Sequence, residues 1–221
     1  MAELSASILA ADLLNLERDI GKAIHSGVKW IHLDVMDGHF VPNLTMGIPF
    51  GDAIRKKFDV NIESHMMVDN PDMYLEKYCS FSKLVTIHYE APVQTVRMLK
   101  EIENRGSMPG ISINPKTPVS SIESLLPSVK YVLVMTVEPG FSGQGLIEEA
   151  AQKIPLLSEY RRRNNLDFLI GIDGGIKRDN ISHIASLGPD IIVSASAIFS
   201  GNVEENINSL RSCIKENRNG Q

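Results

Sequence analysis

Short apolar runs alternate with amphipathic stretches along the whole sequence, and this alternation limits the fold more than any other feature. Runs typical of strands cover residues 3–8, 30–35, 60–67, 83–88, 110–113, 131–137, 167–173 and 190–194. Helical periodicity covers residues 13–26, 50–57, 71–79, 93–104, 119–126, 146–163, 178–187 and 203–216. Eight strands alternating with eight helices in 221 residues predict a single (β/α)8 TIM barrel, one domain that spans residues 1–221.

An open, doubly wound α/β sheet is the structural alternative. We disfavour it because no Gly-x-Gly-x-x-Gly follows the first expected strand, and because the alternation runs unbroken to the last helix. A net charge of -5 argues against nucleic acid or an anionic membrane as a partner, whereas a small phosphorylated ligand is compatible with it. No apolar run reaches the length of a membrane span, and no targeting segment precedes the first strand, so we expect a cytoplasmic protein.

The second expected strand carries polar side chains on one face. Apolar Ile31, Leu33 and Val35 alternate with the other residues of positions 30–36. Because a strand repeats every two residues, His32 and Asp34 point to the same side. An imidazole and a carboxylate placed this way suit a metal site or a proton-transfer site. They also suit a buried structural pair, and this stretch alone does not decide between the two interpretations.

The C-terminal ends of the other strands carry further reactive residues. A barrel places its active site at these ends. They supply Ser7, His65, Met67, His88, Glu90, Asn114, Met135 and Asp173. Two histidines and two carboxylates converging from three strands form a credible ligand set for a divalent cation. His25 and His183 fall on expected helices and receive no role, and His39 lies in the loop after the second strand.

Glycine-rich segments follow the last three strands. These are Glu138-Pro139-Gly140-Phe141-Ser142-Gly143-Gln144-Gly145, Asp173-Gly174-Gly175 and Ser194-Ala195-Ser196-Ala197. Small residues expose backbone N–H groups, and a short helix starting near Ser196 would aim its positive end at an anion. Their convergence predicts a phosphate site, although Gly140 and Gly143 alone would be explained by turns.

Three methionines, Met36, Met67 and Met135, lie on the inward face near strand ends. Methionine is most often core filler. Three at equivalent heights also suit a water-poor layer beneath a reacting centre, and both interpretations stay open.

Long ordered motifs resemble the ribulose-phosphate 3-epimerase family over nearly the whole chain. The motifs are Ser7-Ile8-Leu9-Ala10-Ala11-Asp12, His32-Leu33-Asp34-Val35-Met36-Asp37-Gly38-His39-Phe40-Val41-Pro42-Asn43, His65-Met66-Met67-Val68, Asn114-Pro115-Lys116-Thr117-Pro118, Met135-Thr136-Val137-Glu138-Pro139-Gly140-Phe141-Ser142-Gly143-Gln144 and Asp173-Gly174-Gly175-Ile176. The resemblance implies interconversion of D-ribulose 5-phosphate and D-xylulose 5-phosphate in the pentose phosphate pathway. It also implies a homo-oligomer, since the family commonly forms dimers or higher assemblies.

The resemblance also implies roles for individual residues. One divalent ion, of zinc, iron(II), manganese or cobalt, would be bound by His32, Asp34, His65 and Asp173. Asp34 and Asp173 would be the acid–base pair, and Ser7 would touch the substrate. The phosphate would be held by Gly143, Gly174, Gly175 and the Ala195-Ser196 backbone. The substrate would also meet Gly140, His65, Met36, Met67 and Met135.

Three residues depart from the family pattern. Glu63 stands where relatives usually carry Asp, Gly171 where they often carry Glu or Gln, and Ala195 where they carry Gly. Ala195 predicts an ordinary negative φ at that position or a slightly moved phosphate, because alanine disfavours positive φ. The departures leave the sugar open, with D-allulose 6-phosphate as the nearest rival substrate. More distant alternatives are a phosphosugar lyase or decarboxylase and a non-catalytic phosphosugar-binding barrel.

Overall fold

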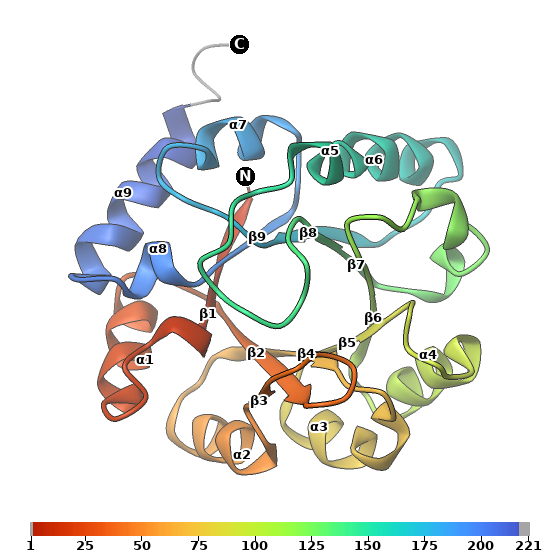
Figure 1. Ribbon diagram of the computed structural model, residues 1–221, viewed down its shortest axis with the longest axis horizontal. Helices are drawn as coiled ribbons and strands as arrows, with labels where there is room; N and C mark the ends of the chain where they lie inside the picture. Colours follow the sequence, from red (N-terminus) through yellow and green to blue (C-terminus); the bar gives the residue numbers. More distant parts are fainter. Residues whose placement is uncertain (1, 217–221) are drawn as a thin grey trace.

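The protein, seen in a computed structural model that describes residues 2–216, is built around a closed ring of parallel strands (Figure 1). The barrel strands are β1 (Glu3–Ser7), β2 (Trp30–Asp37), β4 (Asn61–Met67), β5 (Leu84–His88), β6 (Met108–Ile113), β7 (Tyr131–Met135), β8 (Leu169–Asp173) and β9 (Ile191–Ser194). The ring closes because β1 pairs in parallel with both β2 and β9. The predicted (β/α)8 barrel is therefore confirmed, and the open sheet is excluded. Residues 1 and 217–221 of the expected domain lie outside the described residues.

Helices surround the ring on the outside, as Figure 1 shows. They are α1 (Leu16–His25), α2 (Ile48–Lys57), α3 (Leu75–Phe81), α4 (Thr95–Asn104), α5 (Glu148–Ala151), α6 (Lys153–Arg163), α7 (Ile181–Ser186), α8 (Ser196–Phe199) and α9 (Val203–Glu216). Short 3-10 turns also occur: η1 (Ile8–Ala10), η2 (Pro71–Met73), η3 (Val119–Ser121) and η4 (Leu126–Ser128). In the part of the chain that the structure describes, no helix has the length and apolar character needed to cross a membrane.

The sequence-based prediction is wrong in the segment after β6. The helix expected over 119–126 is replaced by the 3-10 turns η3 and η4. Ser120 and Ser121 compete for backbone hydrogen bonds in non-helical conformations, and Pro127 has no N–H to donate. A run this short does not form an α-helix against those residues.

Other boundaries differ by a few residues. The helix expected over 146–163 is divided at Gln152 into α5 and α6, with Pro155 in the first turn of α6, where a missing N–H costs nothing. The first helix starts at Leu16 because Asp12 caps the N–H of Leu14 in a preceding turn. A short strand, β3 (Leu44–Thr45), pairs antiparallel with the end of β2 and was not expected.

Register brings the polar residues of neighbouring strands to the same height. Outward side chains of β2 such as Leu33 pack in the main core between the ring and the helices. Inward side chains lie beside those of the next strands, because Asp34 is the register partner of His65, and His32 is that of both Ser7 and Glu63. The alternation seen in the sequence therefore places these side chains together inside the ring, near the C-terminal ends of the strands.

Candidate metal and acid–base site

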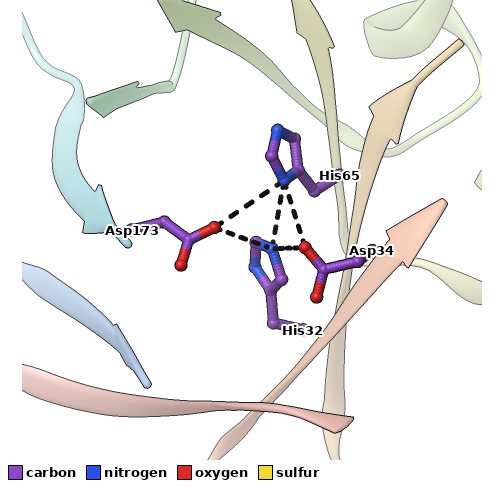
Figure 2. Close-up of side chains that lie close together, drawn as sticks. All are labelled: His32, Asp34, His65 and Asp173. Atoms are coloured by element: carbon purple, nitrogen blue, oxygen red, sulfur yellow. Dashed lines mark hydrogen bonds and ion pairs between the residues drawn. The ribbon is translucent and has the colours of Figure 1, made fainter. Parts of the chain in front are cut away.

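Four side chains meet at the C-terminal end of the barrel: His32, Asp34, His65 and Asp173. One ligand atom from each lies within 4.8 Å of all the others. His32 Nε2 is 3.2 Å from His65 Nδ1 and 3.4 Å from Asp34 Oδ1. Asp173 Oδ2 lies 3.8 Å from His32 Nε2 and 4.0 Å from His65 Nδ1. Figure 2 shows the two carboxylates reaching the histidines from opposite sides.

The spacing of these atoms fits a divalent ion. Nitrogen and oxygen ligands at about 2.0–2.2 Å from a tetrahedral ion lie roughly 3.3–3.6 Å from one another. Five of the six pairs of ligand atoms are 3.2, 3.4, 3.6, 3.8 and 4.0 Å apart, close to that range, and all six pairs lie within 4.8 Å. Two imidazoles and two carboxylates are also a donor set that binds zinc, iron, manganese and cobalt. The site can therefore hold one such ion.

His32 is oriented by a buried carboxylate. His32 Nδ1 lies 2.9 Å from Glu63 Oε2, and both side chains are fully buried. Glu63 Oε1 accepts a hydrogen bond of 3.0 Å from Thr86 Oγ1. Because an ionised carboxylate only accepts hydrogen bonds, the proton of a neutral His32 sits on Nδ1, and Nε2 is left free to face the cluster.

His65 has a longer chain of partners. Its Nε2 lies 2.8 Å from His88 Nε2, and His88 Nδ1 lies 3.2 Å from Glu90 Oε2. Both imidazoles are fully buried. The sequence placed His88 and Glu90 at a strand end without separating them from candidate ligands. In the structure they form a hydrogen-bonded chain from His65, and neither belongs to the four-residue cluster.

Asp34 is held from two further directions. The Ser7 hydroxyl donates a hydrogen bond of 2.6 Å to Asp34 Oδ2, the oxygen that does not face His32. The Thr45 hydroxyl of β3 donates to the Asp34 backbone carbonyl. The unexpected strand β3 therefore fixes the backbone that carries Asp34.

The two carboxyl groups differ in their affinity for protons. Burial opposes ionisation of Asp34, but the charge of His32 and hydrogen bonds from His32 and His65 outweigh it and hold the pKa of Asp34 well below its usual range. Burial raises the pKa of Asp173 to about 7, with the charges of Asp34 and Glu63 acting in the same direction and His32 opposing them. In the metal-free cluster, one carboxyl is ionised near neutral pH while the other holds a proton for part of the time.

The imidazoles of His32, His65 and His88 also differ in pKa. Burial alone would lower the pKa of His32, but the negative charges of Glu63 and Asp34 outweigh it and raise that pKa well above its usual range. Burial lowers the pKa of His65, and it lowers that of His88 to about 4. His88 is therefore neutral near pH 7.

A pocket opens above the cluster and is lined by the glycine-rich segments. Its walls include Gly140, Gly143, Gly174, Gly175, Ala195 and Ser196 together with Ser7, Asp34 and Asp173. Gly175 requires glycine, because its φ is +68° and a Cβ there would lie 2.4 Å from the Leu146 backbone nitrogen. In Figure 1 the green segment between β7 and α5 crosses the centre of the ring, and residues 139–144 of this segment line the pocket.

The three inward methionines also line this pocket. All are buried: Met36 and Met67 pack with Val41, and Met135 packs with the barrel-interior residues that include Val137 and Val193. They therefore form two apolar walls rather than one continuous layer.

The sequence model of a protein family, described as the ribulose-phosphate 3 epimerase family, matches residues 3–199 of this chain. The chain is 40% identical over 216 residues to ribulose-phosphate 3-epimerase of Aquifex aeolicus, and the match covers 97% of each chain. It is 41% identical over 199 residues to the enzyme of that name from Treponema pallidum, over 90% of this chain and 91% of that one. The chain belongs to the ribulose-phosphate 3-epimerase family. It is thus an isomerase of the kind that acts on carbohydrates, and the resemblance seen in the motifs is confirmed.

Solved structures of other enzymes share the fold. The 3-keto-L-gulonate-6-phosphate decarboxylase of Vibrio cholerae superposes with a TM-score of 0.74 over 97% of this chain and 98% of its own, at 11% identity. The 3-hexulose-6-phosphate synthase of Salmonella typhimurium superposes with a TM-score of 0.71 over 97% of this chain and 99% of its own, at 15% identity. At such low identity the similarity shows the barrel fold alone.

Two departures from the epimerase family pattern have a structural explanation. Ala195 has a φ of -110°, so the negative φ predicted for it is confirmed and the position does not require glycine. At Gly171, a Cβ would lie 1.9 Å from the Tyr131 hydroxyl. Tyr131 fills the space that a larger residue at 171 would need, and its hydroxyl has no hydrogen-bond partner among the described residues.

Sequence reasoning missed some members of this epimerase site. Glu63 was noted only as a departure, although it lies two residues before His65 and so shares its inward face. Lys177 lines the pocket and was not singled out. The loop from His39 to Asn43 lacked an assigned contact. In the structure Asn43 Nδ2 donates to Gly140 O at 2.9 Å, so the loop supports the segment after β7, while His39 is exposed and bonds to Asp37.

Proposed function

We propose that this protein is a metal-dependent 3-epimerase that interconverts D-ribulose 5-phosphate and D-xylulose 5-phosphate. The observation that carries the proposal is the pair of carboxyl groups facing each other across two histidines, with pKa values displaced in opposite directions. When two paired titratable groups differ in pKa in this way, one can act as the acid and the other as the base.

The chemistry requires a proton carrier on each face of the sugar. Inverting C3 of a 2-ketose removes the proton next to the carbonyl and returns a proton to the opposite face of a planar enediolate. Asp34, which is ionised, acts as the base on one face, and Asp173, which can hold a proton near neutral pH, acts as the acid on the other. The reverse reaction exchanges the two roles.

His32, Asp34, His65 and Asp173 are the residues that would hold the metal ion. When bound, a divalent ion there supplies Lewis-acid stabilisation of the negative charge that develops on the substrate oxygens. Zinc, iron(II), manganese and cobalt all suit these ligands, and the choice among them is a matter for metal analysis.

The remaining pocket residues position the substrate and exclude water. Backbone N–H groups around Gly143, Gly174, Gly175, Ala195 and Ser196 would hold the phosphate, which fixes C3 between the two carboxylates. The Ser7 hydroxyl, already on Asp34, would contact the sugar. Met36, Met67 and Met135 provide apolar walls that keep water from the reactive intermediate.

Kinetics on two sugar phosphates, together with metal analysis of the same preparation, tests this function. We expect one equivalent of a divalent metal and a larger kcat/KM for D-ribulose 5-phosphate than for D-allulose 6-phosphate. A much larger kcat/KM for the hexulose phosphate would reassign the substrate. Loss of carbon from the sugar would indicate lyase or decarboxylase chemistry, and full activity in a metal-free preparation would contradict the metal dependence.

A further inference from the structure

A chain of buried hydrogen bonds leads away from the metal cluster behind His65. His65 presents Nδ1 to the other ligands, at 3.2 Å from His32 Nε2, and its opposite nitrogen to His88. His88 in turn presents its second nitrogen to Glu90, whose side chain is mostly buried. The chain therefore joins one ligand to a carboxylate that does not itself touch the cluster.

The donors and acceptors in this chain can be assigned from its far end. The Glu90 carboxylate accepts hydrogen bonds and donates none, so the proton of a neutral His88 lies on Nδ1. His88 Nε2 is then an acceptor, and the hydrogen bond of 2.8 Å between the two Nε2 atoms needs its proton on His65. His65 Nδ1 is thereby left unprotonated, which is the form that coordinates a metal.

The other carboxylate oxygen of Glu90 accepts a hydrogen bond from a group that can only donate. Oε1 accepts from the Asn114 backbone N–H at 2.8 Å and from the Thr117 hydroxyl. Lys153 Nζ holds the loop that carries these donors, through hydrogen bonds of 2.7 Å to the backbone carbonyls of Asn114 and Pro115. A hydroxyl can turn from donor to acceptor, but a backbone N–H only donates. The atom at the position of Glu90 Oε1 must therefore be a hydrogen-bond acceptor.

We propose that Glu90, acting through His88, sets the tautomer and orientation of His65 and so prepares that ligand for the metal. Glu90 and His88 are positioning residues, since neither is among the four side chains of the ligand cluster. The proposal rests on the proposed metal dependence of the enzyme. It adds that the proton on His65 is placed by hydrogen bonds before the metal arrives, rather than by the metal.

Glu90→Gln tests this arrangement with almost no change in shape. The Gln oxygen must face the Asn114 N–H, so its NH2 group faces His88 Nδ1. That nitrogen must then accept, which moves the His88 proton to Nε2, and the His65 proton to Nδ1 in turn. The proton would occupy the atom that coordinates the metal. In the opposite orientation of the Gln amide, its NH2 group and the Asn114 N–H would be two donors facing each other. Neither orientation therefore restores the original series of hydrogen bonds.

We expect Glu90→Gln to raise the zinc dissociation constant about 10- to 100-fold, as loss of an outer partner of a metal-bound histidine does. The measurement is chelator competition with zinc on the full chain, with circular dichroism as a check of folding. Glu101→Gln on α4 is the matched control. The Glu101 carboxylate bonds to the exposed side chains of Arg97 and Arg105, outside the ligand cluster, so this variant should bind zinc as wild type does. Equal zinc affinity in Glu90→Gln and wild type would overturn the proposal.

A second measurement does not depend on how the variant folds. Nitrogen-15 NMR of the histidine rings in chelator-treated wild-type protein should show His65 protonated on Nε2 and His88 on Nδ1. The opposite tautomers would overturn the proposal even if zinc binds. Failure of the wild type to bind any metal would instead contradict the proposed function, so the two results can be told apart.

Discussion

The two sides of the barrel mouth are built from different chemical groups. On the side of β1, β2, β4 and β5, the chemical groups are buried polar and titratable side chains: Ser7, His32, Asp34, Glu63, His65 and His88. On the side of β7, β8 and β9, glycine-rich segments line the pocket with backbone. Asp173 stands at the junction, since it joins the ligand cluster and is followed directly by Gly174 and Gly175.

The proposed function accounts for this difference. Proton transfer and metal binding need groups of defined protonation, which buried hydrogen-bond partners such as Glu63 and Glu90 provide. Holding a phosphate needs several N–H donors at close range, and small residues allow the backbone to approach. Changes on the first side should therefore alter metal content and turnover, whereas changes on the second should alter KM.

The largest effect is expected at the junction. Asp173→Asn removes a proton carrier while keeping its shape, so turnover should fall by about 10⁴-fold with the fold retained. Epimerisation kinetics and a thermal melt check the two parts of this prediction. Near-normal activity would remove Asp173 from the acid–base pair.

On the side of the buried titratable groups, His65→Ala should lower metal content together with rate. The variant loses a ligand and leaves His88 Nε2 without its partner, so we expect metal affinity to fall by more than about a hundredfold. Elemental analysis after dialysis gives the metal content. His183→Ala is the control, because His183 is exposed and bonds to Glu148, outside the cluster. A fully metallated, active His65→Ala would contradict the ligand role.

Metal affinity should depend on pH with a definite sign. The negative charges of Glu63 and Asp34, against the opposing effect of burial, raise the pKa of His32, so metal-free His32 is protonated near pH 7. Binding a metal must displace that proton, and below about pH 7 it must also displace the proton held by Asp173, whose pKa burial raises to about 7. Apparent affinity should therefore rise about tenfold for each pH unit above pH 7 and more steeply below it. Chelator competition at several pH values measures the slope. A flat profile from pH 6 to 8 would show that no proton is released.

The backbone side should respond in KM rather than in metal content. In Gly175→Ala, the new Cβ would meet the Leu146 nitrogen at 2.4 Å, in a residue whose φ is +68°. Displacing this part of the pocket wall should raise KM for the sugar phosphate about tenfold, equal to roughly 1.4 kcal/mol. Gly188→Ala is a matched control, since Gly188 has a φ of +86° and nothing within 4 Å of an added Cβ. Equal KM changes in both variants would show that the effect comes from backbone strain elsewhere.

The alternation of expected strands and helices was enough to predict the barrel, and the resemblance of the motifs was enough to predict which four side chains meet at its mouth. His32, Asp34, His65 and Asp173 could be placed at strand ends because parallel strands in a closed ring align their C-terminal ends. The 3-10 turns after β6 could not be predicted in this way, since local serine and proline preferences override an apolar pattern there. The chain from His65 to Glu90 was also missed, because it depends on side-chain contacts between strands.

Single-turnover epimerisation in deuterated water tests the two-carboxylate account most directly. If Asp34 removes the C3 proton and Asp173 returns one to the other face, the new C3 hydrogen comes from a group equilibrated with solvent. Every xylulose 5-phosphate molecule formed from protiated ribulose 5-phosphate should then carry deuterium at C3. Product that retains the original protium would contradict the account, because it would show one group carrying the same proton from face to face.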